Sequence, residues 1–213
     1  MLQPELFQAK LSFDPAFKDV RRVVLSSNAP PVAGEACSSR SWVDFGPWVS
    51  GSAALFDEIR TTRPWKQRTR TLFDKDVLEP RLTAPWNKAS GQALEPQILE
   101  DLRQALSARY SVEFDSIGFN YYRDGQDSVA WHRDHISREI KEPVVALVSL
   151  GDPRKLLLRP YGGGASTPFL MRSGDLLVTG GLAQRHWEHA ILKVARAGPR
   201  ISLAFRHVAR RRY

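Results

Sequence analysis

Two histidines and one aspartate in the second half of the chain form a pattern that could bind a metal ion. His132 and Asp134 are separated by one residue, and His189 follows well downstream. Two imidazoles and one carboxylate can hold one face of a mononuclear non-haem Fe(II) ion and leave the opposite positions open. The sequence therefore indicates a redox metal centre whose open positions can take a cosubstrate and O₂.

The spacing of these residues constrains which of them can share an ion. In an extended strand, His132 and Asp134 lie on one face, roughly 6–7 Å apart, and Arg133 between them points away. The third ligand has two candidates, because His186 and His189 are three residues apart and would face opposite sides of a strand. Parity alone does not choose between these two histidines.

Two arginines near the end of the chain suit a cosubstrate with two acidic ends. Arg200, Ser202 and Arg206 lie on the polar or small face of an alternating segment whose other face is large and apolar. Six residues span roughly 20 Å of strand, so the two guanidinium groups would reach separate groups. 2-Oxoglutarate has a chelating keto acid end and a distal carboxylate, and therefore needs two separate cations. The competing interpretation is a pair of surface arginines on an edge strand.

The elements that must position these residues are mainly strands. After Tyr110, short apolar or alternating runs recur, and Gly, Pro and Asp separate most of them. About eight such strands after two helices predict an α+β protein that is mostly β, with a double-sheet jelly-roll core. We expect one domain, with an N-terminal arm over residues 1–50, helices and a substrate lid over 51–110, and the core over 111–213.

Two helices are expected before the strands. From Ser52 the apolar residues recur at helical spacing, and Thr61 to Pro64 ends the helix. A second helix begins near Pro96, with Leu99, Leu102 and Leu106 on one face. The stretch between the helices, residues 66–81, is dense in charge.

Composition narrows the class of protein and its partners. The net charge of +8 over 213 residues favours a polyanionic partner, nucleic acid first, and the alternative is a merely basic protein. A single cysteine excludes a disulfide framework within the chain and a thiolate zinc site. No apolar run is long enough to span a bilayer, and the N-terminus does not resemble a secretory signal. We therefore expect a cytoplasmic protein with no membrane contact and no evident obligate protein partner.

The segment from Phe119 to Val208 resembles the AlkB-type Fe(II)/2-oxoglutarate dioxygenases, which repair alkylated nucleic-acid bases by oxidative dealkylation. The matching stretches are FNYYRDGQDSVAWHRD, SGDLLVTGGLAQRHWEHAILKV and PRISLAFRHV. The family order is Asn-x-Tyr, then HxD, then a distal His, then Arg-x5-Arg. This order is filled by Asn120, Tyr122, His132, Asp134, His189, Arg200 and Arg206.

The resemblance implies a role for each of these positions. The expected iron ligands are His132, Asp134 and His189, which favours His189 over His186. The expected 2-oxoglutarate contacts are Asn120 and Arg206 near the keto acid, Tyr122 and Arg200 at the distal carboxylate, and Ser202, where relatives often have Asn. No catalytic residue beyond the metal site is expected, and the cofactors are Fe(II), 2-oxoglutarate and O₂.

The likeness to the family is looser on the substrate side. VLEPRLTAPW resembles the lid that precedes the core, and it places Phe73 where some DNA-repair members carry an apolar finger. Arg81 could contact phosphate, and Trp86 could stack on a flipped base, with core packing as the alternative for both aromatic residues. The loop after HxD begins with His135, also a substrate candidate, and lacks the acidic residues that DNA-repair members tend to have there.

The resemblance implies oxidative dealkylation of N-alkylated bases in DNA, with release of succinate, CO₂ and an aldehyde. A base inside a duplex cannot reach a buried metal, so the target must be flipped out or already single-stranded. The alternatives are a same-fold oxygenase acting on RNA, protein or a small molecule, and a non-catalytic basic nucleic-acid-binding domain. The residues alone leave open the alkyl lesion, the choice of DNA or RNA, the strand preference, the role of Phe73 and the oligomeric state.

Overall fold

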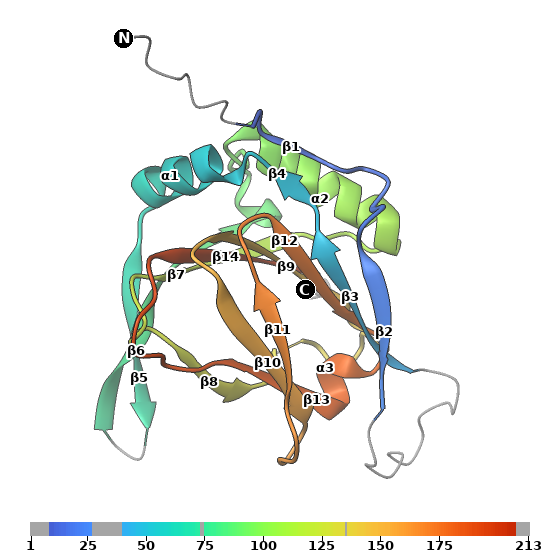
Figure 1. Cartoon of the computed structure of the whole chain (residues 1–213), viewed down its shortest axis with the longest axis vertical. Coiled ribbons are helices and arrows are strands. Elements are labelled where there is room, and N and C mark those ends of the chain that lie inside the picture. Colours follow the sequence, from blue (N-terminus) through green and yellow to red (C-terminus); the bar gives the residue numbers. More distant parts are fainter. Residues whose placement is uncertain (1–8, 27–39, 73–74, 135, 208–213) are drawn as a thin grey trace, which may run out of the picture.

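The computed structural model describes residues 9–26, 40–72, 75–134 and 136–207, which form two antiparallel sheets with helices on one side (Figure 1). The larger sheet has eight strands in the order β2-β3-β12-β9-β14-β7-β6-β5. Their bounds are Arg21–Leu25 (β2), Ser41–Pro47 (β3), Asp175–Gly180 (β12), Val145–Gly151 (β9), Arg200–Arg206 (β14), Ser116–Tyr122 (β7), Lys75–Asn87 (β6) and Lys66–Leu72 (β5).

The smaller sheet has four strands in the order β11-β10-β13-β8. Their bounds are Thr167–Met171 (β11), Arg154–Pro160 (β10), Trp187–Ile191 (β13) and Val129–His132 (β8). Two short strands, Ser12–Phe13 (β1) and Val49–Ser50 (β4), pair separately. A buried apolar cluster with members from both larger sheets, such as Leu158, Met171 and Leu177, fills the space between them. This double-sheet arrangement is the jelly roll that the sequence predicts.

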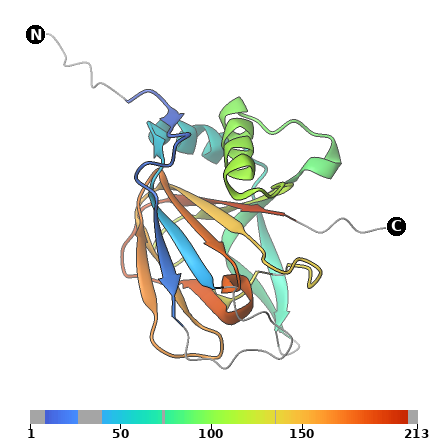
Figure 2. The ribbon, with the colours of Figure 1, turned by 90° about the vertical axis from the view of Figure 1, so that its right-hand side faces the viewer.

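The helical elements are α1 (Ser52–Thr62), α2 (Gln97–Tyr110), the four-residue α3 (Ala183–His186) and a 3₁₀ turn (Lys88–Ser90). The two long helices, α1 and α2, cover the outer face of the eight-stranded sheet, whereas the short α3 lies at the other end of the barrel next to β13 (Figure 1 and Figure 2). Leu55 and Ile59 of α1 and Leu99, Leu102 and Leu106 of α2 are buried against apolar residues of β7, β9, β12 and β14. Both predicted helices are thus confirmed, with the predicted apolar faces. Within the described ranges, no helix combines the length and apolar character that crossing a membrane requires.

Strands outside the expected core segment belong to the same sheet. β2 and β3, from the expected arm, pair beside β12, and the charge-dense stretch between the helices forms the β5–β6 hairpin beside β7. No strand was expected in that stretch, because its charged residues hide the alternation. The hairpin lies at the sheet edge, where charged side chains face solvent and Ala84 and Trp86 of β6 turn inward. The sheet therefore extends well beyond residues 111–213.

Candidate metal and cosubstrate site

Two neighbouring strands of the smaller sheet bring the three candidate ligands together. His132 ends β8 and pairs directly with His189 in the middle of β13. The two imidazole centroids are 4.3 Å apart, and Asp134 follows β8 by two residues. One ligand atom from each of the three side chains lies within 4.8 Å of the other two. This arrangement could hold one metal ion from one side.

The structure corrects one expectation about the residues next to these ligands and agrees with another. His186 is the last residue of α3, not part of β13, so it never shares a strand with His189 and is outside the ligand group. Arg133 lies at the edge of the cavity, but its guanidinium is directed outward, as expected, onto the ring of Tyr161 at 3.7 Å.

The donor atoms of the three side chains fit a metal. His132 Nδ1 lies 2.8 Å from the carbonyl oxygen of Ala130; a carbonyl can only accept, so Nδ1 carries the proton and Nε2 keeps its lone pair. Asp134 Oδ1 accepts hydrogen bonds from Nε and Nη2 of Arg206 at 3.1 and 2.8 Å. Asp134 Oδ2 is buried and has no hydrogen-bond partner among the described residues. A buried carboxylate oxygen without a partner is costly, and a metal ion would compensate it.

The electrostatics keep both enclosed ligands in their metal-binding forms. Burial raises the pKa of the Asp134 carboxyl, but the charge and hydrogen bonds of Arg206, together with both imidazoles, lower it to about 2. Burial lowers the pKa of His189 to about 4, although the Asp134 carboxylate opposes this change. At neutral pH the site therefore presents an ionised carboxylate and a neutral imidazole.

These pKa shifts predict how the stability of the metal-free protein depends on pH. Between pH 6.5 and about 4, the unfolded chain binds a proton at His189 that the folded protein does not, so stability falls as pH falls. Asp134 adds a further loss of the same sign between pH 3.8 and about 2. In urea unfolding of chelator-treated protein, His189→Gln should flatten the decline between pH 6.5 and 4. An unchanged slope would contradict the assignment of that decline to His189.

Arg200 lies at the inner end of β14 and is 1% exposed. Its Nε donates to Ser149 Oγ at 2.9 Å, while Nη1 and Nη2 have no hydrogen-bond partner among the described residues. Its guanidinium lies 5.3 Å from the centre of the Tyr122 ring. Burial lowers the pKa of Arg200 to about 10, which leaves it charged at neutral pH. A buried cation with two unsatisfied nitrogens is a site for an anion.

The register of β14 gathers the other expected cosubstrate residues. On its β7 side, Arg200 pairs with Tyr122 and Ser202 pairs with Asn120. Asn120 Nδ2 donates to the carbonyl of Gly118 at 3.2 Å. All of these side chains line one cavity of about 700 Å³, together with the three candidate ligands and Arg206. The sequence reasoning missed Ser149, whose hydroxyl orients Arg200 from the neighbouring strand β9.

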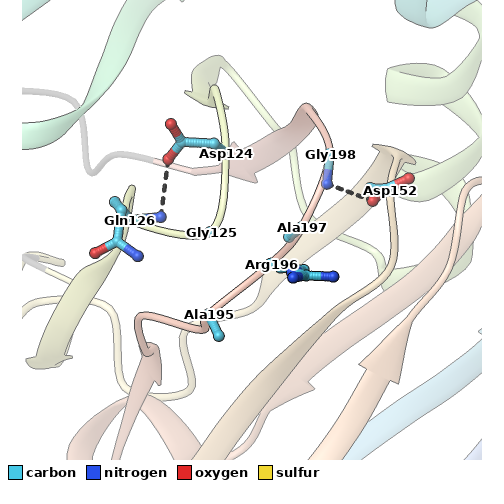
Figure 3. A pocket seen from close by; sticks show the side chains of 8 residues that line it. All are labelled: Asp124, Gly125, Gln126, Asp152, Ala195, Arg196, Ala197 and Gly198. Carbon is cyan, nitrogen blue, oxygen red and sulfur yellow. Dashed lines mark hydrogen bonds between the residues drawn. The ribbon is translucent and has the colours of Figure 1, made fainter.

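A second hollow, of about 550 Å³, lies among the loops that close the barrel before Arg200 (Figure 3). Asp124 accepts from the backbone N–H of Gln126 at 2.8 Å, and Asp152 accepts from that of Gly198. Arg154 is buried nearby and donates to the carbonyl oxygens of Asp124, Asp127 and Leu192. These hydrogen bonds tie the loops of this hollow to one another.

A family model described as the 2OG-Fe(II) oxygenase superfamily matches residues 53–206. The chain belongs to this superfamily. It is 29% identical over 201 residues to alpha-ketoglutarate-dependent dioxygenase alkB homolog 3 of Bos taurus, covering 85% of this chain and 69% of the relative. It is 30% identical over 195 residues to DNA oxidative demethylase ALKBH2 of Arabidopsis thaliana, covering 74% and 62%. The AlkB-type resemblance is confirmed by these matches.

Membership of the 2OG-Fe(II) oxygenase superfamily identifies the cofactors as Fe(II), 2-oxoglutarate and O₂. When bound, Fe(II) and 2-oxoglutarate would activate O₂, which is the oxidant that the protein's own side chains cannot provide. The chain of this oxygenase contributes binding and orientation: a facial set of ligand atoms at one end of the cavity and a buried cation on β14. The unpartnered atoms Asp134 Oδ2 and Arg200 Nη1 and Nη2 match these two groups in charge and in position within one cavity.

The structure describes two of the four residues expected to contact substrate. Arg81 lines the cavity and forms an ion pair with Glu79 at 3.1 Å. Trp86 also lines the cavity, but it is 8% exposed, belongs to the core under the helices and donates its indole N–H to the carbonyl of Gln92 at 3.0 Å. Phe73 and His135 lie outside the described residues.

Arg185 of α3 holds the loop that follows the HxD motif of this oxygenase. Its guanidinium donates to the carbonyl oxygens of Ile136, Ser137 and Ile140 at 3.3, 2.8 and 2.7 Å. Nothing in the local sequence marked this arginine, because its acceptors are backbone atoms more than forty residues away.

Replacing Arg185 with methionine is therefore expected to loosen residues 136–140. Hydrogen bonds from charged groups contribute about 1.5–3 kcal/mol each, so amide exchange in this loop should accelerate by at least about ten-fold. Hydrogen–deuterium exchange with mass spectrometry measures this, with peptides from α2 as an internal reference. Arg172→Met, at an exposed arginine, is the matched control, and equal exchange in both variants would contradict the prediction.

Proposed function

We propose that this oxygenase removes N-alkyl groups from nucleic-acid bases, with DNA as the first substrate to test. The products would be the repaired base, an aldehyde, succinate and CO₂. In this proposal, His132, Asp134 and His189 hold Fe(II). Support comes from the similarity to relatives named as a DNA oxidative demethylase and as alkB homologs.

One observation carries the proposal: the His132–Asp134–His189 group and the buried Arg200 line the same cavity. In the proposal, Arg200 and Tyr122 hold the distal carboxylate of 2-oxoglutarate, and Ser149 keeps the guanidinium turned inward. Asn120, Ser202 and Arg206 lie closer to the metal end of β14. Arg206 would act at the keto acid end while it also orients Asp134, since it already hydrogen-bonds that carboxylate.

In this proposal, the core strands and the β5–β6 hairpin have different roles. We assign metal and cosubstrate binding to the core strands within residues 111–213, and nucleotide recognition to the β5–β6 hairpin within 51–110. Arg68, Arg81 and Trp86 of the hairpin line the cavity beside the candidate ligands. The chain carries a net charge of +8, so its attraction to a polyanion is general and independent of sequence.

Binding of a methylated single-stranded oligonucleotide should therefore weaken steeply with salt. The slope of log affinity against log salt is about −0.7 for each phosphate contact to a single strand. Arg68 is exposed at the cavity, so Arg68→Ala should reduce the slope by about 0.7. Fluorescence anisotropy at several salt concentrations measures this, with Arg21→Ala on the far edge strand β2 as the control. A salt-independent affinity of the wild-type protein would contradict a nucleic-acid partner.

The proposed function is tested by succinate release and by mass spectrometry of the base. The protein is incubated with Fe(II), 2-oxoglutarate and ascorbate, and with DNA or RNA oligonucleotides that carry different N-methylated bases. Loss of the methyl group, with succinate formed above the level seen with unmodified strands, is the expected result. Turnover with methylated RNA alone would change the substrate. No loss of methyl from any oligonucleotide would reject the proposal.

A further inference from the structure

Tyr161 is a large, exposed aromatic side chain that contacts Arg133, a residue of the cavity lining. It follows the end of β10, and its backbone N–H donates to the carbonyl of His186 at 2.8 Å, which ties the turn to α3 (Figure 1). Three glycines with positive φ come next and leave the ring unscreened. The residue is 59% exposed, so a large part of its side chain is accessible to solvent.

One face of the Tyr161 ring is covered by a fixed cation. The guanidinium carbon of Arg133 lies 3.7 Å from the ring centre. Arg133 is itself held, because its Nη1 donates to the carbonyl of Arg185 at 2.8 Å. Arg133 also lines the cavity that contains His132 and Asp134. Since Arg133 covers one face and Tyr161 is 59% exposed, the open side of the ring faces solvent next to a residue that lines the cavity.

A second pair of an arginine and an aromatic ring lies on the outer face of the smaller sheet. Arg159, two residues before Tyr161 on β10, lies with its guanidinium carbon 4.0 Å from the centre of the Trp131 ring. Its Nε donates to Glu188 at 2.6 Å, so the carboxylate of this cluster is paired with a cation. Aromatic rings alternating with guanidinium groups are what a single nucleic-acid strand requires, because bases stack on the rings and phosphates contact the cations.

From this arrangement we infer that Tyr161 and Arg133 form a stacking platform for a nucleotide that flanks the target base. The inference rests on the proposed function, and it specifies the substrate as single-stranded nucleic acid. The open face of Tyr161 takes an unpaired base, and Arg133 contacts the adjoining phosphate. A neighbour inside a duplex is already stacked between its own neighbours, so the platform favours single strands.

Binding to Tyr161 variants tests the inference. The Mn(II)- and 2-oxoglutarate-loaded protein is titrated into a labelled, methylated single-stranded DNA, and affinity is read by anisotropy. Tyr161→Ala should weaken binding on the order of ten-fold, since stacking on one ring has about that effect. Tyr161→Phe should bind like the wild type, and so should Val23→Ala, a control that trims an exposed apolar residue on β2. Equal affinity of Tyr161→Ala and the wild type would overturn the inference.

A second series locates the stacked base and separates stacking from a general surface effect. Strands with one base removed at each position around the lesion are bound to the wild type and to Tyr161→Ala. At one flanking position, removal of the base should lower the affinity of the wild type. The same removal should not change the affinity of Tyr161→Ala, because the variant has already lost the contact between the ring and that base. If the two effects add at every position, the ring does not stack on a base and the inference fails.

Failure of the platform is distinguishable from failure of the proposed function. Succinate release from the wild type with the same methylated strand reports on the function alone. If the wild type demethylates the strand and Tyr161→Ala binds it equally well, only the platform is wrong. If the wild type demethylates no strand, the proposed function is wrong and the inference falls with it.

Discussion

The His132→Ala protein is expected to keep its fold and to lose turnover of 2-oxoglutarate. His132 is at the end of β8, and its imidazole is fixed by the Ala130 carbonyl and faces His189 on the neighbouring strand. Its removal leaves two of the three candidate ligand side chains. Loss of an outer-shell partner alone lowers metal affinity by 10- to 100-fold, so loss of a ligand should cost more than about a hundred-fold.

Titration with Co(II), followed by its visible absorption, measures metal affinity independently of activity. Circular dichroism and thermal unfolding of the metal-free variant verify the fold. His207→Gln is the matched control, because His207 accepts the backbone N–H of Val144 at 2.9 Å and is outside the ligand group. Co(II) affinity or turnover that survives in His132→Ala would show that the metal binds elsewhere.

Replacing Arg200 with methionine should raise the KM for 2-oxoglutarate by about a hundred-fold or more. Removing one partner of a buried charge pair costs 2–5 kcal/mol, and Arg200 is 1% exposed. The same change should leave the ligand-free protein equally or more stable, because a buried guanidinium with two unpartnered nitrogens is replaced by an apolar side chain. The rise in Tm that 2-oxoglutarate gives the metal-loaded wild type should then largely vanish.

A cosubstrate without the distal carboxylate supplies the second arm of this experiment. With 2-oxobutyrate, the wild type should be impaired about as much as Arg200→Met is with 2-oxoglutarate. The two changes should not add when combined, because both delete one ion pair. An unchanged 2-oxoglutarate requirement in Arg200→Met, or fully additive effects, would mean that another cation binds the distal group.

The sequence predicts those parts of the site that depend on local spacing. Arg200 and Arg206 alternate with apolar residues on one strand, so their shared face follows from strand geometry. His132 and Asp134 were also expected together, but Asp134 lies two residues beyond the end of β8, so the turn of the chain brings it to the site. The distinction between His186 and His189 needed the family resemblance, because parity assumed one strand where the chain forms a helix and then a strand.

Contacts between distant segments could not be predicted from the residues. The Ser149–Arg200 and Asp134–Arg206 hydrogen bonds join positions 51 and 72 residues apart, and only the packed barrel brings them together. The β5–β6 hairpin was missed for a different reason. Its many charged residues resemble a solvated loop, and its strand conformation depends on pairing with β7.

The alternation along β14 separates residues that stabilise the fold from residues that line the cavity. Its odd-numbered positions are apolar and completely buried under the helices: Ile201, Leu203 and Phe205. Its even-numbered positions all line the cavity: Arg200, Ser202, Ala204 and Arg206. A smaller side chain at an odd position lowers the free energy of unfolding. A stabilising substitution elsewhere in the chain can restore that stability. A substitution at an even position removes a contact to the cavity that no distant substitution replaces, so the two sets of positions differ in what can compensate for a change.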